Sequence, residues 1–225
     1  MNTISKIIFA LGSLFFIASL FFPELNLFAD SGIIAAVICG SISASIQPDC
    51  DNPMVAGADD VLILINKADI DFVTKNGGNP LIIENMLLAS GTSAYSYTGK
   101  NNSNEPSHVL VRKDFAEVYE HTIKFKVFKN DGATKKQLEE LVAGRVVAIV
   151  LNNHRGAAGN SAYEIYGLDS GLILTAHSRN VADDATQGAY DLELKSSPKA
   201  LEPHVPATFY ITSFAATKAI VDGLV

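Results

Sequence analysis

The chain has 225 residues, of which 48% are apolar, so we expect a packed core and exclude general disorder. A formal net charge of −7 excludes broad nucleic-acid binding through phosphates, because that binding needs a surplus of Lys and Arg. Two cysteines are too few for a disulfide framework or a cysteine-based zinc site. We therefore expect Cys39 and Cys50 to be free thiols.

The N-terminal part differs in composition from the rest of the chain. Ile7 to Phe22 carries no charge, and this run is short for a bilayer span and somewhat long for the core of a signal peptide. Residues 47–53 are polar and rich in turn formers, which predicts a boundary. We therefore divide the chain into a hydrophobic leader or membrane segment, 1–46, and a β-rich assembly domain, 47–225. A further interpretation places the natural start of the protein inside the chain.

The first half of the assembly domain reads as strands separated by turns. Val61 to Ile65 is a short β-branched apolar run, typical of a buried strand. Residues 76–80 predict a turn and 81–88 a strand, while Tyr95 and Tyr97 alternate with small polar residues. The Asn- and Ser-rich stretch 99–106 predicts an exposed loop.

The clearest periodic signal lies in residues 121–128. Apolar and polar side chains alternate there, so one set faces the core and the lysines face solvent. A long alternating strand without an internal proline offers an unblunted edge for pairing with a neighbouring subunit. The predicted assembly residues are Thr122, Ile123, Lys124, Phe125, Lys126, Val127 and Phe128.

The second half of the domain adds two helices and further strands. Residues 135–142 predict a helix capped by Thr134 and stopped by Gly144. Residues 214–224 predict a short C-terminal helix, and strands are expected at 145–151, 163–166, 172–175, 190–194 and 209–211. The predicted class is α+β, mainly β: an antiparallel sandwich or barrel-like sheet with a mid-chain and a C-terminal helix. It follows the N-terminal hydrophobic segment.

No stretch of the chain completes a catalytic or metal-binding pattern. The glycine-rich loop 156–159 lacks the Lys-Ser/Thr pair of a phosphate loop, and Ser170 lies one position late for a nucleophile elbow. The acidic groups at 59–60 and at 69 and 71 suit either a solvated loop or a cation site. The five histidines show no helical metal-pair spacing. We expect no catalytic, cofactor or metal site, and no enzyme activity.

The order of the elements from residue 47 onward resembles tail-tube virion proteins of phages that infect Bacteroides and related hosts. An acidic apolar strand at 59–65 is followed by a polar loop, a two-faced strand at 121–128, a helix at 135–142 and a returning strand at 145–151. The motifs Tyr163-Glu-Ile-Tyr-Gly167 and Gly188-Ala-Tyr-Asp-Leu-Glu-Leu194 follow. The resemblance implies a β-sandwich or barrel with a flanking helix and a long loop, stacked as rings.

The expected function is that of a structural subunit that self-assembles into rings or a tube in a phage virion. Its expected partners are copies of itself, other virion proteins and DNA that passes an acidic surface without specific binding. The alternative is a membrane-anchored or exported β-sandwich binding module, for which the apolar run 7–22 would make the membrane contact. A third interpretation is a hydrolase that uses the acidic cluster.

Overall fold

The computed structural model describes residue 42 and residues 44–225. Contacts divide the chain into two units, Met1–Gln47 and Pro48–Val225, and the second unit contains every helix and strand described below. The predicted hydrophobic run 7–22 and Cys39 lie outside the described residues, whereas Cys50 is exposed. No helix in the described part has both the length and the apolar character needed to cross a membrane.

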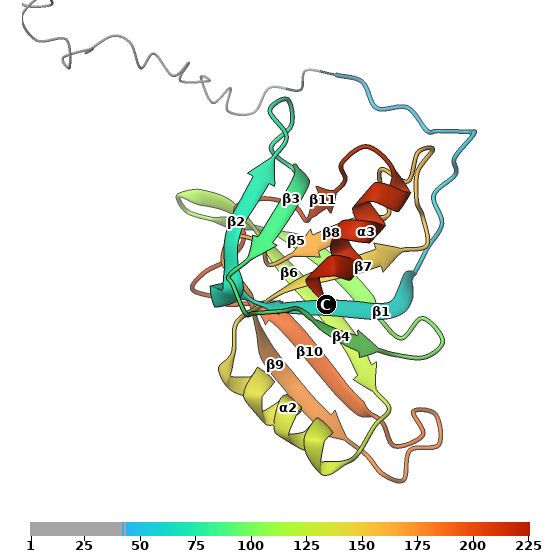
Figure 1. Cartoon of the computed structure of the whole chain (residues 1–225), viewed down its shortest axis with the longest axis vertical. Helices are drawn as coiled ribbons and strands as arrows, with labels where there is room; N and C mark the ends of the chain where they lie inside the picture. Colours follow the sequence, from blue (N-terminus) through green and yellow to red (C-terminus); the bar gives the residue numbers. More distant parts are fainter. Residues whose placement is uncertain (1–41, 43) are drawn as a thin grey trace, which may run out of the picture. The chain divides into compact units, whose positions relative to one another are not determined.

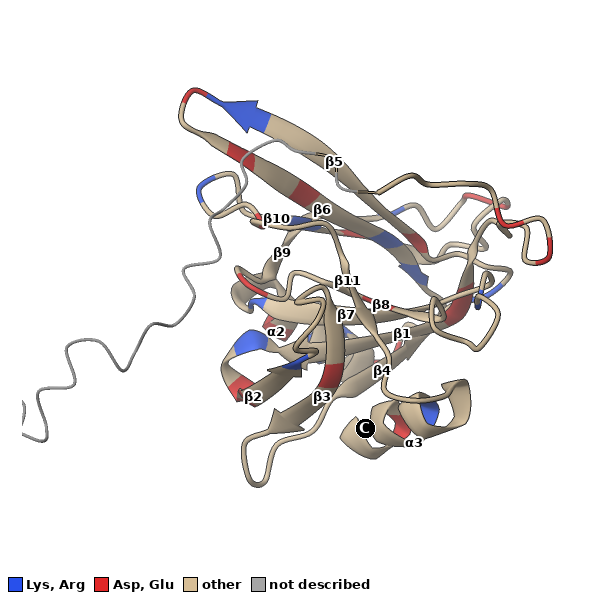
Figure 2. Ribbon diagram, turned by 90° about the horizontal axis from the view of Figure 1, so that it is seen from above, with Lys and Arg blue, Asp and Glu red and all other residues tan. Residues whose placement is uncertain are grey.

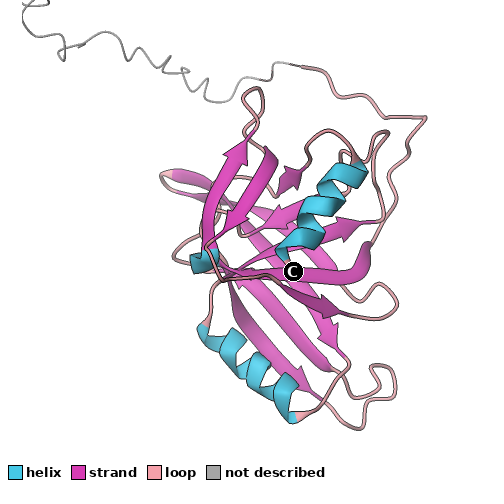
Figure 3. Cartoon of the chain, viewed as in Figure 1, coloured by secondary structure: helices cyan, strands magenta, loops and turns pink. Residues whose placement is uncertain are grey.

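The described part of the second unit is mainly β, as predicted, with one large sheet and two α-helices (Figure 3). A single 3-10 turn, η1 (Lys67–Asp69), separates the first two strands. The helices are α2 (Gly132–Ala143) and α3 (Phe214–Leu224). The strands are β1 (Ala58–Asn66), β2 (Ile70–Lys75), β3 (Ile82–Leu88), β4 (Tyr95–Thr98), β5 (Glu105–Lys113), β6 (Ala116–Val127), β7 (Val146–Asn152), β8 (Tyr163–Tyr166), β9 (Leu172–Arg179), β10 (Tyr190–Ser196) and β11 (Ala207–Phe209).

The strand order explains which edges of the sheet stay open. The order is β2-β3-β11-β8-β7-β9-β10-β6-β5, and β1 pairs with both β7 and β4. Neighbouring strands are antiparallel except β3 and β11, so the sheet is mixed rather than purely antiparallel. In the described sheet, β2, β4 and β5 each have one neighbour and therefore one open side.

The central strands are buried on both faces, which accounts for their continuous apolar sequence. In β1, Leu62 and Leu64 pack into one core cluster, while Ile63 and Ile65 pack into the other. Strand β7 divides its side chains between the same two clusters. A strand that is covered on both sides needs apolar residues at every position, so its sequence shows a run and not an alternation.

Each core cluster is closed by one of the two helices (Figure 1). Leu138 and Leu141 of α2 join the first cluster, and Val221 and Leu224 of α3 join the second. Helix α2 begins earlier than predicted, and its cap is Asp131, whose Oδ1 accepts a hydrogen bond of 2.7 Å from the Thr134 N–H. The prediction of Thr134 as the cap was therefore wrong.

Candidate assembly surfaces

Strands β5 and β6 form a long hairpin whose outer half projects from the sheet (Figure 2). The hairpin is paired from Glu105 opposite Lys124 to Lys113 opposite Ala116. Strand β10 supports β6 only as far as Thr122, so the rest of the hairpin lies beyond the sheet except for a bridge between Tyr119 and Glu202. The outer side of β5 has no strand partner in the described chain.

Apolar side chains are exposed along this hairpin and at its tip. Val109 is 60% exposed, Leu110 is 43% exposed and Phe115 is completely exposed. Val109 and Leu110 are consecutive, so they face opposite sides of β5, and Phe115 lies in the turn that follows the strand. The hairpin thus exposes apolar side chains on both faces and at its tip. The hairpin therefore combines free backbone groups with apolar side chains that this subunit does not bury.

The predicted assembly strand, Thr122–Phe128, is placed differently from the sequence expectation. Thr122, Ile123 and Lys124 pair with β10 on one side and with β5 on the other, so they have no open edge and that part of the expectation was wrong. Residues 125–127 pair with β10, and no described strand lies on their other side. The open edge that the sequence pattern assigned to this segment belongs mainly to β5.

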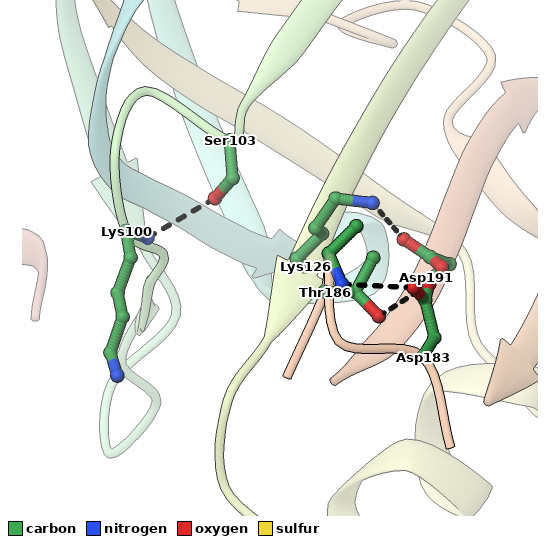
Figure 4. Close-up of polar contacts among 7 residues, drawn as sticks. Lys100, Ser103, Lys126, Asp183, Thr186 and Asp191 are labelled. Atoms are coloured by element: carbon green, nitrogen blue, oxygen red, sulfur yellow. Dashed lines mark hydrogen bonds and ion pairs between the residues drawn. The ribbon is translucent and has the colours of Figure 1, made fainter. Parts of the chain in front are cut away.

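The polar face of β6 and β10 is neutralised by ion pairs across the two strands. Lys126 Nζ contacts Asp191 Oδ1, and Figure 4 shows this pair beside Asp183 and Thr186 of the neighbouring loop. Lys195 Nζ lies 2.9 Å from Glu120 Oε1. The Thr186 hydroxyl donates to Asp183 at 2.8 Å, and this bond holds the pKa of Asp183 below its usual range. Because the charges are paired, this face does not carry the chain's acidic surplus.

A buried polar group, His121, ties the base of the hairpin to the body of the sheet. Its Nε2 lies 2.9 Å from the carbonyl oxygen of His204, and its Nδ1 accepts a hydrogen bond of 3.2 Å from the Gly167 N–H. These two bonds require a neutral ring with the proton on Nε2. Burial lowers the pKa of His121 to about 4, against the raising effect of the His204 carbonyl.

Glu202 anchors the same region from the other side. Its carboxylate accepts hydrogen bonds of 2.9 Å from the N–H groups of Asp169 and Ser170, and its side chain is buried. Burial raises the pKa of Glu202, and the two backbone donors partly offset this rise. We call His121, Glu202 and the turn 167–171 the polar clamp, because together they join β6, β8 and the segment before β11.

A groove with a volume of about 870 Å³ opens between β4 and the end of β6. Tyr97 of β4 and Phe128, which follows β6, form apolar parts of its wall, and Ala133 of α2 forms another. Lys129 and the C-terminal residue Val225 also line it. This groove lies against the open edge of β4.

The other residues that the sequence singled out have local structural roles. Asp60 accepts a hydrogen bond of 2.6 Å from the Asn102 N–H, and Asp69 accepts one of 2.8 Å from the Asn66 side chain. The Ser170 hydroxyl donates to the Leu201 carbonyl at 3.1 Å. Among the described residues, no three His, Cys, Asp or Glu side chains gather as metal ligands would.

No family model, curated protein or solved structure matches this chain.

Proposed function

We propose that this chain is a non-catalytic structural subunit that self-assembles into rings or a tube, as a tail-tube or related tail or connector component of a phage virion. The observation that carries the proposal is the projecting β5–β6 hairpin. It exposes Val109, Leu110 and Phe115 beside an open strand edge. Pro106 blunts the start of this edge, whereas residues 107–111 include no proline, lysine, arginine or acidic residue and remain a template for pairing with another chain.

The geometry of the hairpin favours repeated association between identical subunits. A feature that projects from one side of a subunit and contacts a different surface of its neighbour forms a heterologous contact. Such contacts close into rings when the rotation between subunits is right and form open filaments otherwise. This supports rings or a tube over an isolated dimer.

The remaining partners of the proposal are other virion proteins and DNA. The chain has a net charge of −7, so a passage lined by its acidic surface would repel the phosphate backbone and leave DNA mobile. The paired face of β6 and β10 is a poor candidate for that lining because its charges are neutralised. The proposed location is therefore the virion.

The test is sedimentation of the full chain over a wide concentration range, followed by negative-stain imaging of the fastest species. A constant amount of mild detergent masks the apolar run 7–22, so that association reports on the β-rich unit. Rings or tubes of uniform width are expected. A chain that stays monomeric at high concentration contradicts the proposal and favours the alternative binding module.

A further inference from the structure

The hairpin tip and the groove lie at opposite ends of one strand. Phe115 immediately precedes β6, and Phe128, which lines the groove, immediately follows it. Strand β6 has 12 residues, which at the usual rise per residue separates the two features by roughly 40 Å. The tip of a subunit therefore cannot enter the groove of the same subunit.

The tip and the groove have complementary chemistry. The tip presents a fully exposed phenyl ring with Asp114 beside it. The two cations that precede Asp114 have partners in the same subunit, since Arg112 pairs with Glu117 and Lys113 donates to the Pro198 carbonyl. The groove offers the apolar wall formed by Tyr97 and Phe128, and Lys129 at its margin is already paired with Asp131 at 3.0 Å. A second cation, Lys100, has its Nζ 5.0 Å from the centroid of the Phe128 ring. An aromatic side chain that enters an apolar pocket is a common anchor of an interface hot spot.

We propose that the hairpin tip of one copy, led by Phe115, docks in the groove between β4 and the end of β6 of a second copy. This inference rests on the proposed self-assembly and names the surfaces that carry it. The contact is head-to-tail, because every subunit retains one free tip and one free groove after pairing. Repetition of the contact generates a ring or a filament without any other interface.

Two substitutions each remove one side of this contact. Phe115→Ser removes the anchor at a completely exposed position, and Ala133→Trp fills the groove from an exposed position on α2. Val181→Ser is the matched control, because Val181 is 73% exposed on a different loop. All are made in the full chain and compared with the wild type by circular dichroism before sedimentation.

Each single variant is expected to raise the concentration needed for assembly at least about tenfold, as loss of an aromatic anchor does, and Val181→Ser is expected to leave it unchanged. An equal mixture of the Phe115→Ser and Ala133→Trp chains is expected to give a discrete dimer. The intact tip of one fits the intact groove of the other, and the two remaining surfaces are blocked.

The outcomes separate this inference from the proposed function. If Phe115→Ser assembles at the wild-type concentration, or if the mixture stays monomeric, the tip-in-groove contact is wrong while self-assembly stands. If the wild-type chain itself does not assemble, both proposals are wrong.

Discussion

The fold is expected to lose stability between pH 6.5 and pH 4, because the unfolded chain takes up a proton on His121 that the folded chain does not accept. The neutral ring satisfies both of its neighbours, since Nδ1 accepts from the Gly167 N–H and Nε2–H donates to the His204 carbonyl. A second proton on Nδ1 would face the Gly167 donor, and the buried site would hold an unpaired positive charge. Two other titratable groups act on the pKa of His121: His108 lowers it and Asp169 raises it.

The size of the effect follows from the pKa. Burial lowers the pKa of His121 from 6.5 to about 4, whereas the unfolded chain keeps the ordinary value. Between these two values the unfolded state binds one more proton than the folded state, so the free energy of unfolding rises with pH. The stabilisation is fully present above pH 6.5 and is lost as the pH falls toward 4, by about 3 kcal/mol in total.

The measurement is denaturant unfolding of the full chain at several pH values, for the wild type and for His121→Gln. The glutamine amide retains one acceptor and one donor but does not titrate, so the difference in free energy between the two proteins should shrink as the pH falls. Glu202 has a raised pKa and acts with the opposite sign, but it is present in both proteins and cancels in the difference. A difference that stays constant from pH 7.5 to pH 4 would show that His121 is not held neutral.

Three further substitutions test the fold. Phe125→Ala should cost about 3–5 kcal/mol of unfolding free energy, because the ring is 2% exposed in the first core cluster. Gly167→Ala should also destabilise the chain, since Gly167 has φ +74° and an added Cβ would lie 2.6 Å from Leu172 Cγ. Asp131→Ala should reduce amide protection in the first turn of α2 because the cap is lost. Normal unfolding for the first two variants, or unchanged hydrogen exchange for the third, would contradict these assignments.

The elements that the sequence predicted are those whose side chains have a clear inside and outside. Strand β1 was predicted by its apolar run, which reflects burial on both faces. Strand β6 was predicted by the alternation that places Ile123 and Phe125 in the core. Helix α2 was predicted by a shared face of Leu138, Leu141 and Val142, of which the two leucines are buried and Val142 is 53% exposed. In each case local burial produces a local pattern.

The elements that the sequence missed lack such a pattern. Strand β5 is largely exposed on both faces, so its residues show neither alternation nor a run, and the loop predicted to end at residue 106 ends where β5 begins at Glu105. The short strand β11 lies at 207–209, two residues before its predicted position. The hydrogen bonds of the polar clamp join residues that are 32 to 46 positions apart, and no spacing in the sequence marks such contacts.

The hairpin itself provides the most direct check of which strand is at the edge. Lys124 lies between Glu105 of β5 and Glu193 of β10, so a strand lies on each side of its backbone. Lys124→Pro removes an N–H that faces one of these strands and should leave its acceptor unpaired, at a cost of about 1–3 kcal/mol. Proline is accommodated in an edge strand where its missing N–H would face solvent, and Pro106 occupies β5 in this way. Leu110 shares the orientation of Pro106, being four residues along the strand, so Leu110→Pro should retain the fold.

Val109 has the opposite orientation and serves as the control. Its N–H should face β6, so Val109→Pro should destabilise the hairpin while Leu110→Pro, one residue away, does not. Thermal unfolding and amide exchange in β6 report the difference. Equal loss of stability in the two β5 variants would mean that the outer side of β5 is already paired, and an unperturbed Lys124→Pro chain would mean that β6 is not an interior strand.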